Sequence, residues 1–169
     1  MMKPLSQYKD EQLQLVQPSI WKRVYELRTP DTILYTMHYP KLLGSLVIIE
    51  GFGEKWEVYR PKWWSSTMEI RKEGTQLPIA KFVGNRLGGG GVFELPMGER
   101  VQYRFSIWKG THELQGEHQQ QLILFKRKIS FKSVLNVVIE KQSPVVDKYP
   151  WLAMVVYRII LEQRSHAGH

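Results

Sequence analysis

The densest positive charge of the chain lies in the segment FKRKISFK, Phe125 to Lys132. Its four cationic side chains, with no acidic residue between them, are Lys126, Arg127, Lys128 and Lys132. Phe125, Ile129 and Phe131 place apolar groups between the charges. Near an anionic membrane each surface cation contributes about 1 kcal/mol. The segment therefore predicts a site for phosphate groups of lipid or nucleic acid, or else a hairpin whose lysines are simply solvated.

A second candidate is the segment YRPKWWSS, Tyr59 to Ser66, which follows a predicted strand. Arg60 and Lys62 stand beside the adjacent indoles of Trp63 and Trp64. Indole prefers the headgroup level of a bilayer, so this basic loop predicts a membrane-interface anchor. The alternative is that one indole folds back and fills an end of the domain.

The glycine-rich segment GNRLGGGG, residues 84–91, contains Arg86. Successive backbone N–H groups in such a loop can bind an anion, with the Arg86 guanidinium beside them. The alternative is a hairpin tip, for which glycine is the usual residue. We include Arg86 among the predicted anion-binding residues.

Enzyme signatures are incomplete throughout the chain. GFGEKW lacks the third glycine of a dinucleotide loop, GNRLGGGG lacks the ending of a phosphate loop, and HELQGEH has Gly116 where a zinc helix requires histidine. His112, Glu113, Glu117 and His118 could bind a metal only by meeting across a hairpin. We therefore predict no catalytic residue, no metal and no cofactor. The alternative is an enzyme for a phosphorylated or acidic small molecule.

Chain length, cysteine content and net charge restrict the class of protein. The 169 residues suit a single domain over the whole chain, 1–169, with a sizeable core. There is no cysteine, and the start of the chain lacks the apolar core of a signal peptide, so we expect a cytoplasmic protein. The net charge of +8 favours an anionic partner. Charge is the only feature of the sequence that favours nucleic acid. We expect anionic lipid rather than nucleic acid; a protein partner is a further alternative.

The most apolar stretch is YPWLAMVVYRIIL, residues Tyr149 to Leu161. Its thirteen residues would rise roughly 20 Å as a helix, whereas a bilayer core is about 30 Å thick, so we predict no transmembrane span. Apolar side chains cover every direction of the helix except that of Arg158. Such a helix needs protein around its whole circumference. We predict it over Pro150–Leu161, with Pro150 in the first turn and Asp147 at its N-terminus.

Short strands account for nearly all of the preceding chain. RVQYRFSIW alternates apolar and polar residues most clearly, and we count about twelve such segments separated by turns. Three of them share the order of an apolar strand end, a polar turn, a threonine and a leucine: YELRTPDTIL, MEIRKEGTQL and FSIWKGTHEL. We interpret these three as antiparallel hairpins.

About twelve strands followed by an apolar helix predict a closed, mainly β barrel that encloses the helix. The alternative is a β-sandwich with the helix lying on one sheet. The hairpin segments YELRTPDTILYTM and MEIRKEGTQLPIAKF, together with YPWLAMVVYRIIL, resemble the tubby C-terminal-like superfamily, in particular its LURP-one-related and phospholipid-scramblase-like branch. The resemblance extends from about Leu13 to Leu161 and implies a twelve-stranded barrel around a hydrophobic C-terminal helix. The helix is too short for the membrane-inserting role associated with scramblases.

The resemblance implies function only in outline. Tubby members are phosphoinositide-binding, membrane-associated modules, and LURP-one-related members look like non-enzymatic domains. Together with the basic segments, this leads us to expect a non-enzymatic module for anionic ligands, with phospholipid headgroups at a membrane surface as the leading case.

Overall fold

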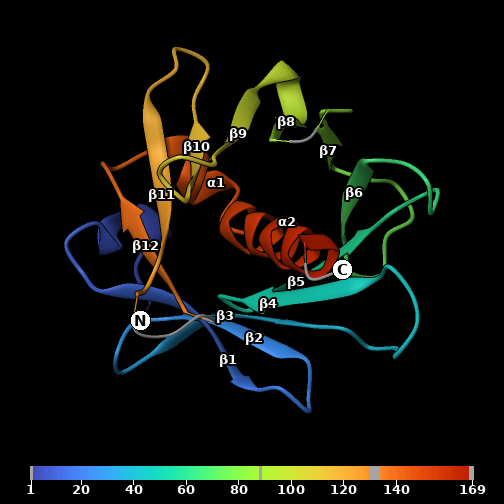
Figure 1. Cartoon of the computed structure of the whole chain (residues 1–169), viewed down its shortest axis with the longest axis horizontal. Coiled ribbons are helices and arrows are strands. Elements are labelled where there is room, and N and C mark those ends of the chain that lie inside the picture. The colour runs from blue at the N-terminus through green and yellow to red at the C-terminus, as the bar shows by residue number, and fades with distance from the viewer. Residues whose placement is uncertain (1, 88, 130–133, 168–169) are drawn as a thin grey trace.

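The computed structural model describes residues 2–87, 89–129 and 134–167 (Figure 1). Its helical elements are the 3-10 helices η1 (Leu5–Tyr8) and η2 (Pro96–Gly98) and the α-helices α1 (Pro144–Lys148) and α2 (Leu152–Ala167). Its strands are β1 (Leu13–Ser19), β2 (Val24–Arg28), β3 (Ile33–His38), β4 (Val47–Gly51), β5 (Glu54–Tyr59), β6 (Thr67–Lys72), β7 (Ala80–Gly84), β8 (Gly90–Glu94), β9 (Arg100–Ser106), β10 (Thr111–Gln115), β11 (Gln121–Arg127) and β12 (Leu135–Ile139).

The strands form one closed antiparallel barrel in chain order. Each strand pairs with its neighbours in the sequence, and β1 pairs with β12, with Leu13 opposite Val137, to close the ring. Alternation sets the faces: Val101 and Tyr103 of β9 point into the barrel, whereas Gln102 and Arg104 point outward. The predicted mainly β barrel is confirmed, and the β-sandwich alternative is wrong.

Helix α2 occupies the interior of the barrel (Figure 1). Every residue from Leu152 to Ile160 is buried, whichever side of the helix it lies on. The barrel wall supplies the apolar surface that this helix needs around its circumference, and the helix fills a space that the strand side chains alone would leave open. The prediction of an enclosed apolar helix is thus confirmed.

The predicted helix bounds, Pro150–Leu161, need correction at both ends. Pro150 lies in the turn between α1 and α2, and α2 begins at Leu152. It continues to Ala167 because polar residues end the apolar run without ending the helix; Glu162 and Gln163 are good helix formers. Asp147 does not cap α2. It lies in α1, whose N-cap is Ser143.

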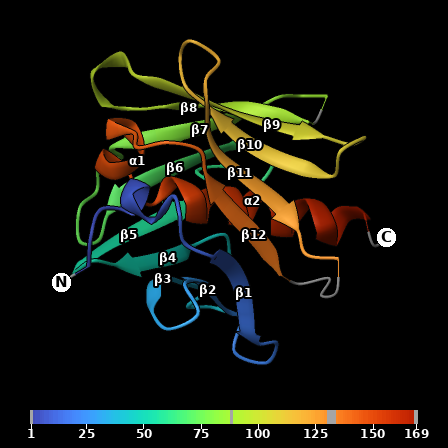
Figure 2. The ribbon, with the colours of Figure 1, turned by 90° about the vertical axis from the view of Figure 1, so that its left-hand side faces the viewer.

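The two ends of the barrel differ in how they are covered. At one end, which we call the closed end, η1 packs against α1, and the backbone N–H and hydroxyl of Ser6 donate hydrogen bonds of 2.8 and 2.6 Å to the Asp147 carboxylate. At the other, the open end, α2 leaves the barrel. Figure 2 shows α1 and the N-terminus on the left and the emerging end of α2 on the right.

The three textually similar segments do form hairpins, namely β2–β3, β6–β7 and β9–β10. Because successive turns of an up-and-down barrel alternate between its ends, the first two turns lie at the closed end and the third lies at the open end. The similarity therefore describes a local hairpin pattern and not a rotational repeat of the barrel.

Substitution of Val156 by Asp tests the enclosure of α2. Val156 is fully buried, so the carboxylate would lose its hydration without gaining a partner, and we expect the free energy of unfolding to fall by several kcal/mol. The measurement is urea unfolding, with Val138→Asp on the outer face of β12 as the control, expected to cost about 1 kcal/mol or less. Equal stability of the two variants would contradict an enclosed helix.

Candidate functional site

Six strand connections lie at the open end, and we call them the open-end loops. In an up-and-down barrel every second connection shares an end, and the described residues of these six connections are 20–23, 39–46, 60–66, 85–87, 89, 107–110, 128–129 and 134. Contacts join them to one another and to α2. Arg23 donates to the carbonyl of Leu42, and residues of the loops line two pockets beside the last turns of α2.

Large apolar side chains project from every one of these loops. The most exposed, between 68% and 101% accessible, are Ile20, Trp21, Leu42, Leu43, Trp63, Trp64, Leu87, Ile107, Trp108 and Ile129. At the closed end, only Leu77 and Met97 among the described residues reach that exposure. Exposed apolar residues scattered singly need no explanation, but a set gathered at one end of a barrel indicates an interaction surface.

Charge divides between the two ends in the same way. The described residues of the open-end loops include no acidic residue and eight cationic ones: Lys22, Arg23, Lys41, Arg60, Lys62, Arg86, Lys109 and Lys128. The connections at the closed end carry one cation, Lys141, and five acidic residues: Asp31, Glu73, Glu99, Glu117 and Glu140. The net positive charge predicted to attract an anionic partner is therefore concentrated at the end that exposes indoles and aliphatic side chains.

The Trp63–Trp64 loop is held in place by an ion-pair network. Glu162 of α2 binds both Arg60 and Arg158, the latter at 3.0 Å, and Arg60 also donates to the carbonyl of Ser65 at 2.8 Å. Arg158, which is buried, reaches the carbonyl of Val58 at 2.8 Å as well. The predicted ligand Arg60 thus has a positioning role in the structure, since it ties the loop to the helix.

Both indoles of this loop point into solvent. Trp63 and Trp64 are 86% and 68% exposed and meet edge to face with ring centroids 5.5 Å apart, and Lys62 lies over the Trp64 ring. The alternative in which one indole fills the barrel end is wrong, because α2 and its ion pairs already occupy that space. The loop thus presents exposed indoles beside a basic side chain, which is the combination predicted from YRPKWWSS.

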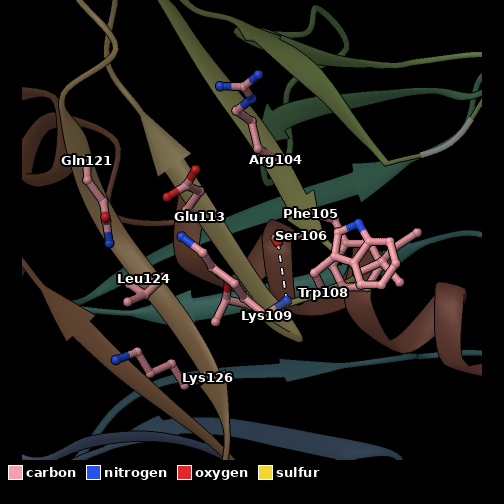
Figure 3. Close-up of a pocket in the computed structure, with 11 residues that line it drawn as sticks. Arg104, Phe105, Ser106, Trp108, Lys109, Glu113, Gln121, Leu124 and Lys126 are labelled. Atoms are coloured by element: carbon pink, nitrogen blue, oxygen red, sulfur yellow. Dashed lines mark hydrogen bonds between the residues drawn. The ribbon is translucent and has the colours of Figure 1, made fainter.

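The described cations of FKRKISFK, which are Lys126, Arg127 and Lys128, do not form one cluster. Strand alternation sends Lys126 of β11 to the outer face, where Figure 3 shows it on the same strand face as Leu124 and Gln121. Arg127, opposite the buried Leu135 of β12, turns toward the barrel axis. Lys128 begins the following loop. Lys132 lies outside the described residues.

Arg127 instead meets a residue that sequence analysis did not select, Arg164 of α2. Both line a pocket of about 820 Å³ between the emerging helix and strands β9 to β12, which we call the Arg127–Arg164 pocket. Its walls combine apolar side chains with Lys109, Lys126 and His112, and no acidic residue lines it. The pocket opens at the same end as the exposed indoles.

His112 forms part of the wall of this pocket. Its ring stacks on Phe105, with centroids 4.5 Å apart, and its Nδ1 lies 2.7 Å from the hydroxyl of Tyr103. Burial, together with the nearby guanidinium groups of Arg164 and Arg127, lowers the pKa of His112 to about 4. The imidazole is therefore neutral at pH 7.

The metal alternative is not assembled in the described part of the chain, where no group of three or more metal-ligating side chains converges. His112 points inward, and Glu117 accepts a hydrogen bond from the backbone N–H of Arg100. In the glycine-rich segment, Arg86 is exposed in the 85–89 loop. A side chain at Gly91 would overlap the Phe82 ring, so this glycine is required for strand packing.

No α-helix in the described residues is long and apolar enough to cross a membrane. Comparison with known proteins bears on the fold alone. No family model matches the chain, and no curated protein does. The X-ray structure of a protein from Arabidopsis thaliana, AT5G01750, is similar with a TM-score of 0.61 at 14% identity, and the match covers 92% of this chain and 91% of that one. At this identity the likeness is one of fold.

Sequence reasoning missed most of the exposed apolar side chains at the open end. Trp21, the Leu42–Leu43 pair and Trp108 each stand within two positions of a lysine or arginine, but Trp21 and Trp108 lie in segments predicted to be strands. For the leucine pair the signal was available, because the order of turns in an up-and-down barrel says which of them share an end. No such signal marked Arg164, because Arg127, which lies beside it in the structure, is far from it in the sequence.

The buried His112 predicts acid sensitivity. Its folded pKa of about 4 lies below the ordinary value of 6.5, so the unfolded chain binds the proton more readily. Stability is therefore full above about pH 6.5 and falls as the pH drops toward 4, by roughly 3 kcal/mol in all. Urea unfolding across this range should show a shallower decline for His112→Gln than for wild type.

The same substitution at the exposed His118 is the control for loss of an imidazole as such. If His112→Gln and wild type keep a constant difference in free energy of unfolding from pH 7 to pH 4, the neutral, buried state of His112 is refuted.

Proposed function

We propose that the protein is a non-enzymatic binding module for anionic ligands, and that its open end docks on membranes containing anionic phospholipids. One observation carries the proposal. The described open-end loops combine eight cations with ten highly exposed apolar side chains, four of them indoles, and lack any acidic residue. Cations suit the phosphate layer of a bilayer, whereas indole and aliphatic groups suit the zone just beneath it.

The apolar component favours a membrane over nucleic acid. A phosphodiester backbone is bound by cations and polar groups, and its bases by stacking on aromatic rings. Neither use explains exposed aliphatic tips such as Leu42, Leu43, Leu87 and Ile129, which are 83% to 101% accessible. In a bilayer interface these side chains lose contact with water, which stabilises the bound state by about 25 cal/mol for each Å² removed.

The charge component favours a membrane over a catalytic centre. The cations are spread over six loops around the barrel end and do not converge on one reacting atom. Such a distributed set attracts an extended anionic surface. The expected resemblance to the tubby C-terminal-like superfamily is consistent with a membrane-associated role, and we propose on these grounds a cytoplasmic protein that binds peripherally to membranes.

The indole pair provides the first test. Replacement of Trp63 and Trp64 by Ala should weaken binding to phosphatidylserine-containing vesicles at least about tenfold, even at low salt, because inserted apolar surface is lost. The measurement is vesicle co-sedimentation over a range of lipid concentrations. The matched control is Leu77→Ala with Met97→Ala, which removes two equally exposed apolar side chains at the closed end and should leave binding unchanged.

Equal losses in the two double variants would contradict docking through the open end. A wild-type protein that fails to bind these vesicles at low salt would refute the membrane proposal, and a soluble anion or an acidic protein would then be the better partner.

The cations provide a test with a different signature. Lys62→Gln with Lys109→Gln removes two charges from the open-end loops, whereas Lys9→Gln with Lys141→Gln removes two from the other side of the molecule. We expect the first pair to weaken vesicle binding about tenfold or more and to reduce its salt dependence, because each cation near the surface contributes about 1 kcal/mol. The second pair should change binding less than about twofold; the reverse order would contradict the proposed orientation.

A further inference from the structure

The Arg127–Arg164 pocket contains two guanidinium groups that have no counterion among the residues that the structure describes. Arg127 comes from the end of β11 and Arg164 from the last turn of α2. No acidic side chain among the described residues forms an ion pair with either one, although ten ion pairs are present elsewhere in that part of the chain. Burial lowers the pKa of Arg164, and the nearby charge of Arg127 lowers it further. Two like charges in a partly enclosed space are mutually unfavourable unless an anion lies between them.

Helix geometry explains one of these cations but not both. A cation in the last turn of a helix interacts favourably with the partial negative charge of the helix end, and Arg164 has that position. Arg127 belongs to another element and adds repulsion. Lys109 and Lys126 also border the pocket, but both line the outer-face pocket together with Glu113 as well, so the pair without an acidic neighbour among the described residues is Arg127 and Arg164. Two guanidinium groups without an acidic neighbour match a group that carries two negative charges, such as a phosphate monoester, better than a single carboxylate.

Much of the remaining wall is apolar. Ile107, Ile129, Leu135 and Ile160 line it, together with the edge of Phe105. Ile107 and Ile129 belong to open-end loops and are among the most exposed aliphatic side chains of the protein. A volume of about 820 Å³ lies within the usual range for small-ligand pockets and is much larger than a bare phosphate ion requires. The wall therefore suits a ligand with an anionic head and an apolar portion.

The neutral imidazole of His112 adds a fixed polar edge. Its Nδ1 is engaged with the Tyr103 hydroxyl, whose contact with Gln163 at 3.5 Å extends the network to α2. Gln163 also lines the pocket. Because stacking on Phe105 and the bond to Tyr103 hold the ring in place, a ligand that binds here does not have to order it.

From this arrangement we infer that the Arg127–Arg164 pocket binds a phosphate monoester attached to an apolar chain, with the phosphate between the two guanidinium groups and the chain against Ile107, Ile129 and Ile160. This deepens the proposed membrane docking, on which it rests for the route by which a lipid would reach the pocket. A monoester lipid headgroup and a soluble alkyl phosphate share this chemistry.

The experiment uses soluble hexyl phosphate, with inorganic phosphate, hexyl sulfate and 1-hexanol as comparison ligands, each titrated by calorimetry into the full chain. We expect hexyl phosphate to bind at least about tenfold more tightly than the other three, because only it carries both a dianionic head and a chain. Arg127→Gln and Arg164→Gln should each weaken its binding at least about tenfold. Arg86→Gln, on an open-end loop outside the pocket, should change it less than twofold.

NMR chemical shifts of the backbone amides supply a second measurement. It uses only the wild-type protein, so misfolding of a variant cannot affect it. Hexyl phosphate should shift the amides of Gly110, His112 and Arg164 most strongly. Equal affinity for all four ligands, or shifts confined to the other loops, would overturn the inference.

Vesicle binding distinguishes a lipid headgroup from a soluble phosphate ester as the ligand. It also distinguishes failure of the membrane proposal from failure of the pocket proposal. Tighter binding to phosphatidic acid than to phosphatidylglycerol at equal surface charge, lost in Arg164→Gln, supports a lipid headgroup. Hexyl phosphate binding without any vesicle binding supports a soluble phosphate ester and refutes the membrane proposal alone. Vesicle binding without hexyl phosphate binding refutes the pocket and leaves the docking surface standing.

Discussion

The structure depends on one constraint, which is that the apolar segment Leu152–Ile160 must be surrounded by protein on every side. A closed sheet meets that requirement and also pairs every strand edge. The helix can enter such a barrel only through an end, and the chain covers the entry side with α1 and η1, joined by the Ser6–Asp147 hydrogen bonds. The exit side cannot be closed in the same way, because α2 itself passes through it.

The last turns of α2 organise that exit side through helical periodicity. Arg158, Leu161, Glu162 and Ser165 share one face and line the pocket that contains Trp63. Ile160, Gln163, Arg164 and Ala167 share another face and line the Arg127–Arg164 pocket. On the first face the cations have a carboxylate partner, Glu162, and serve to position a loop. On the second face Arg164 has no carboxylate partner among the described residues. Its guanidinium group is therefore available to a ligand, whereas that of Arg158 is not.

Much of the fold was predictable because it rests on local periodicity. Alternation in segments such as RVQYRFSIW gave the strands, and the uniform apolarity of YPWLAMVVYRIIL required enclosure. The helix bounds were wrong because Pro150 suits a turn as well as a first helical turn, and because Glu162 to Ala167 extend the helix without an apolar pattern.

The candidate site was only partly predictable. Adjacency in FKRK suggested a cluster, whereas alternation sends Lys126 and Arg127 to opposite faces.

The position of the charges says more about an anionic partner than the net charge does. At physiological ionic strength exposed charges act over about 8 Å, so only the cations at the contacting surface attract an anionic membrane. A chain with the same charge of +8 spread evenly would present few of them at once. Here the acidic residues of the turns lie at the closed end and most cations of the turns at the open end, so under the proposed function the open end faces the membrane. That orientation brings the exposed indoles and the Arg127–Arg164 pocket to the same surface, and the barrel ensures it because consecutive turns alternate between its ends.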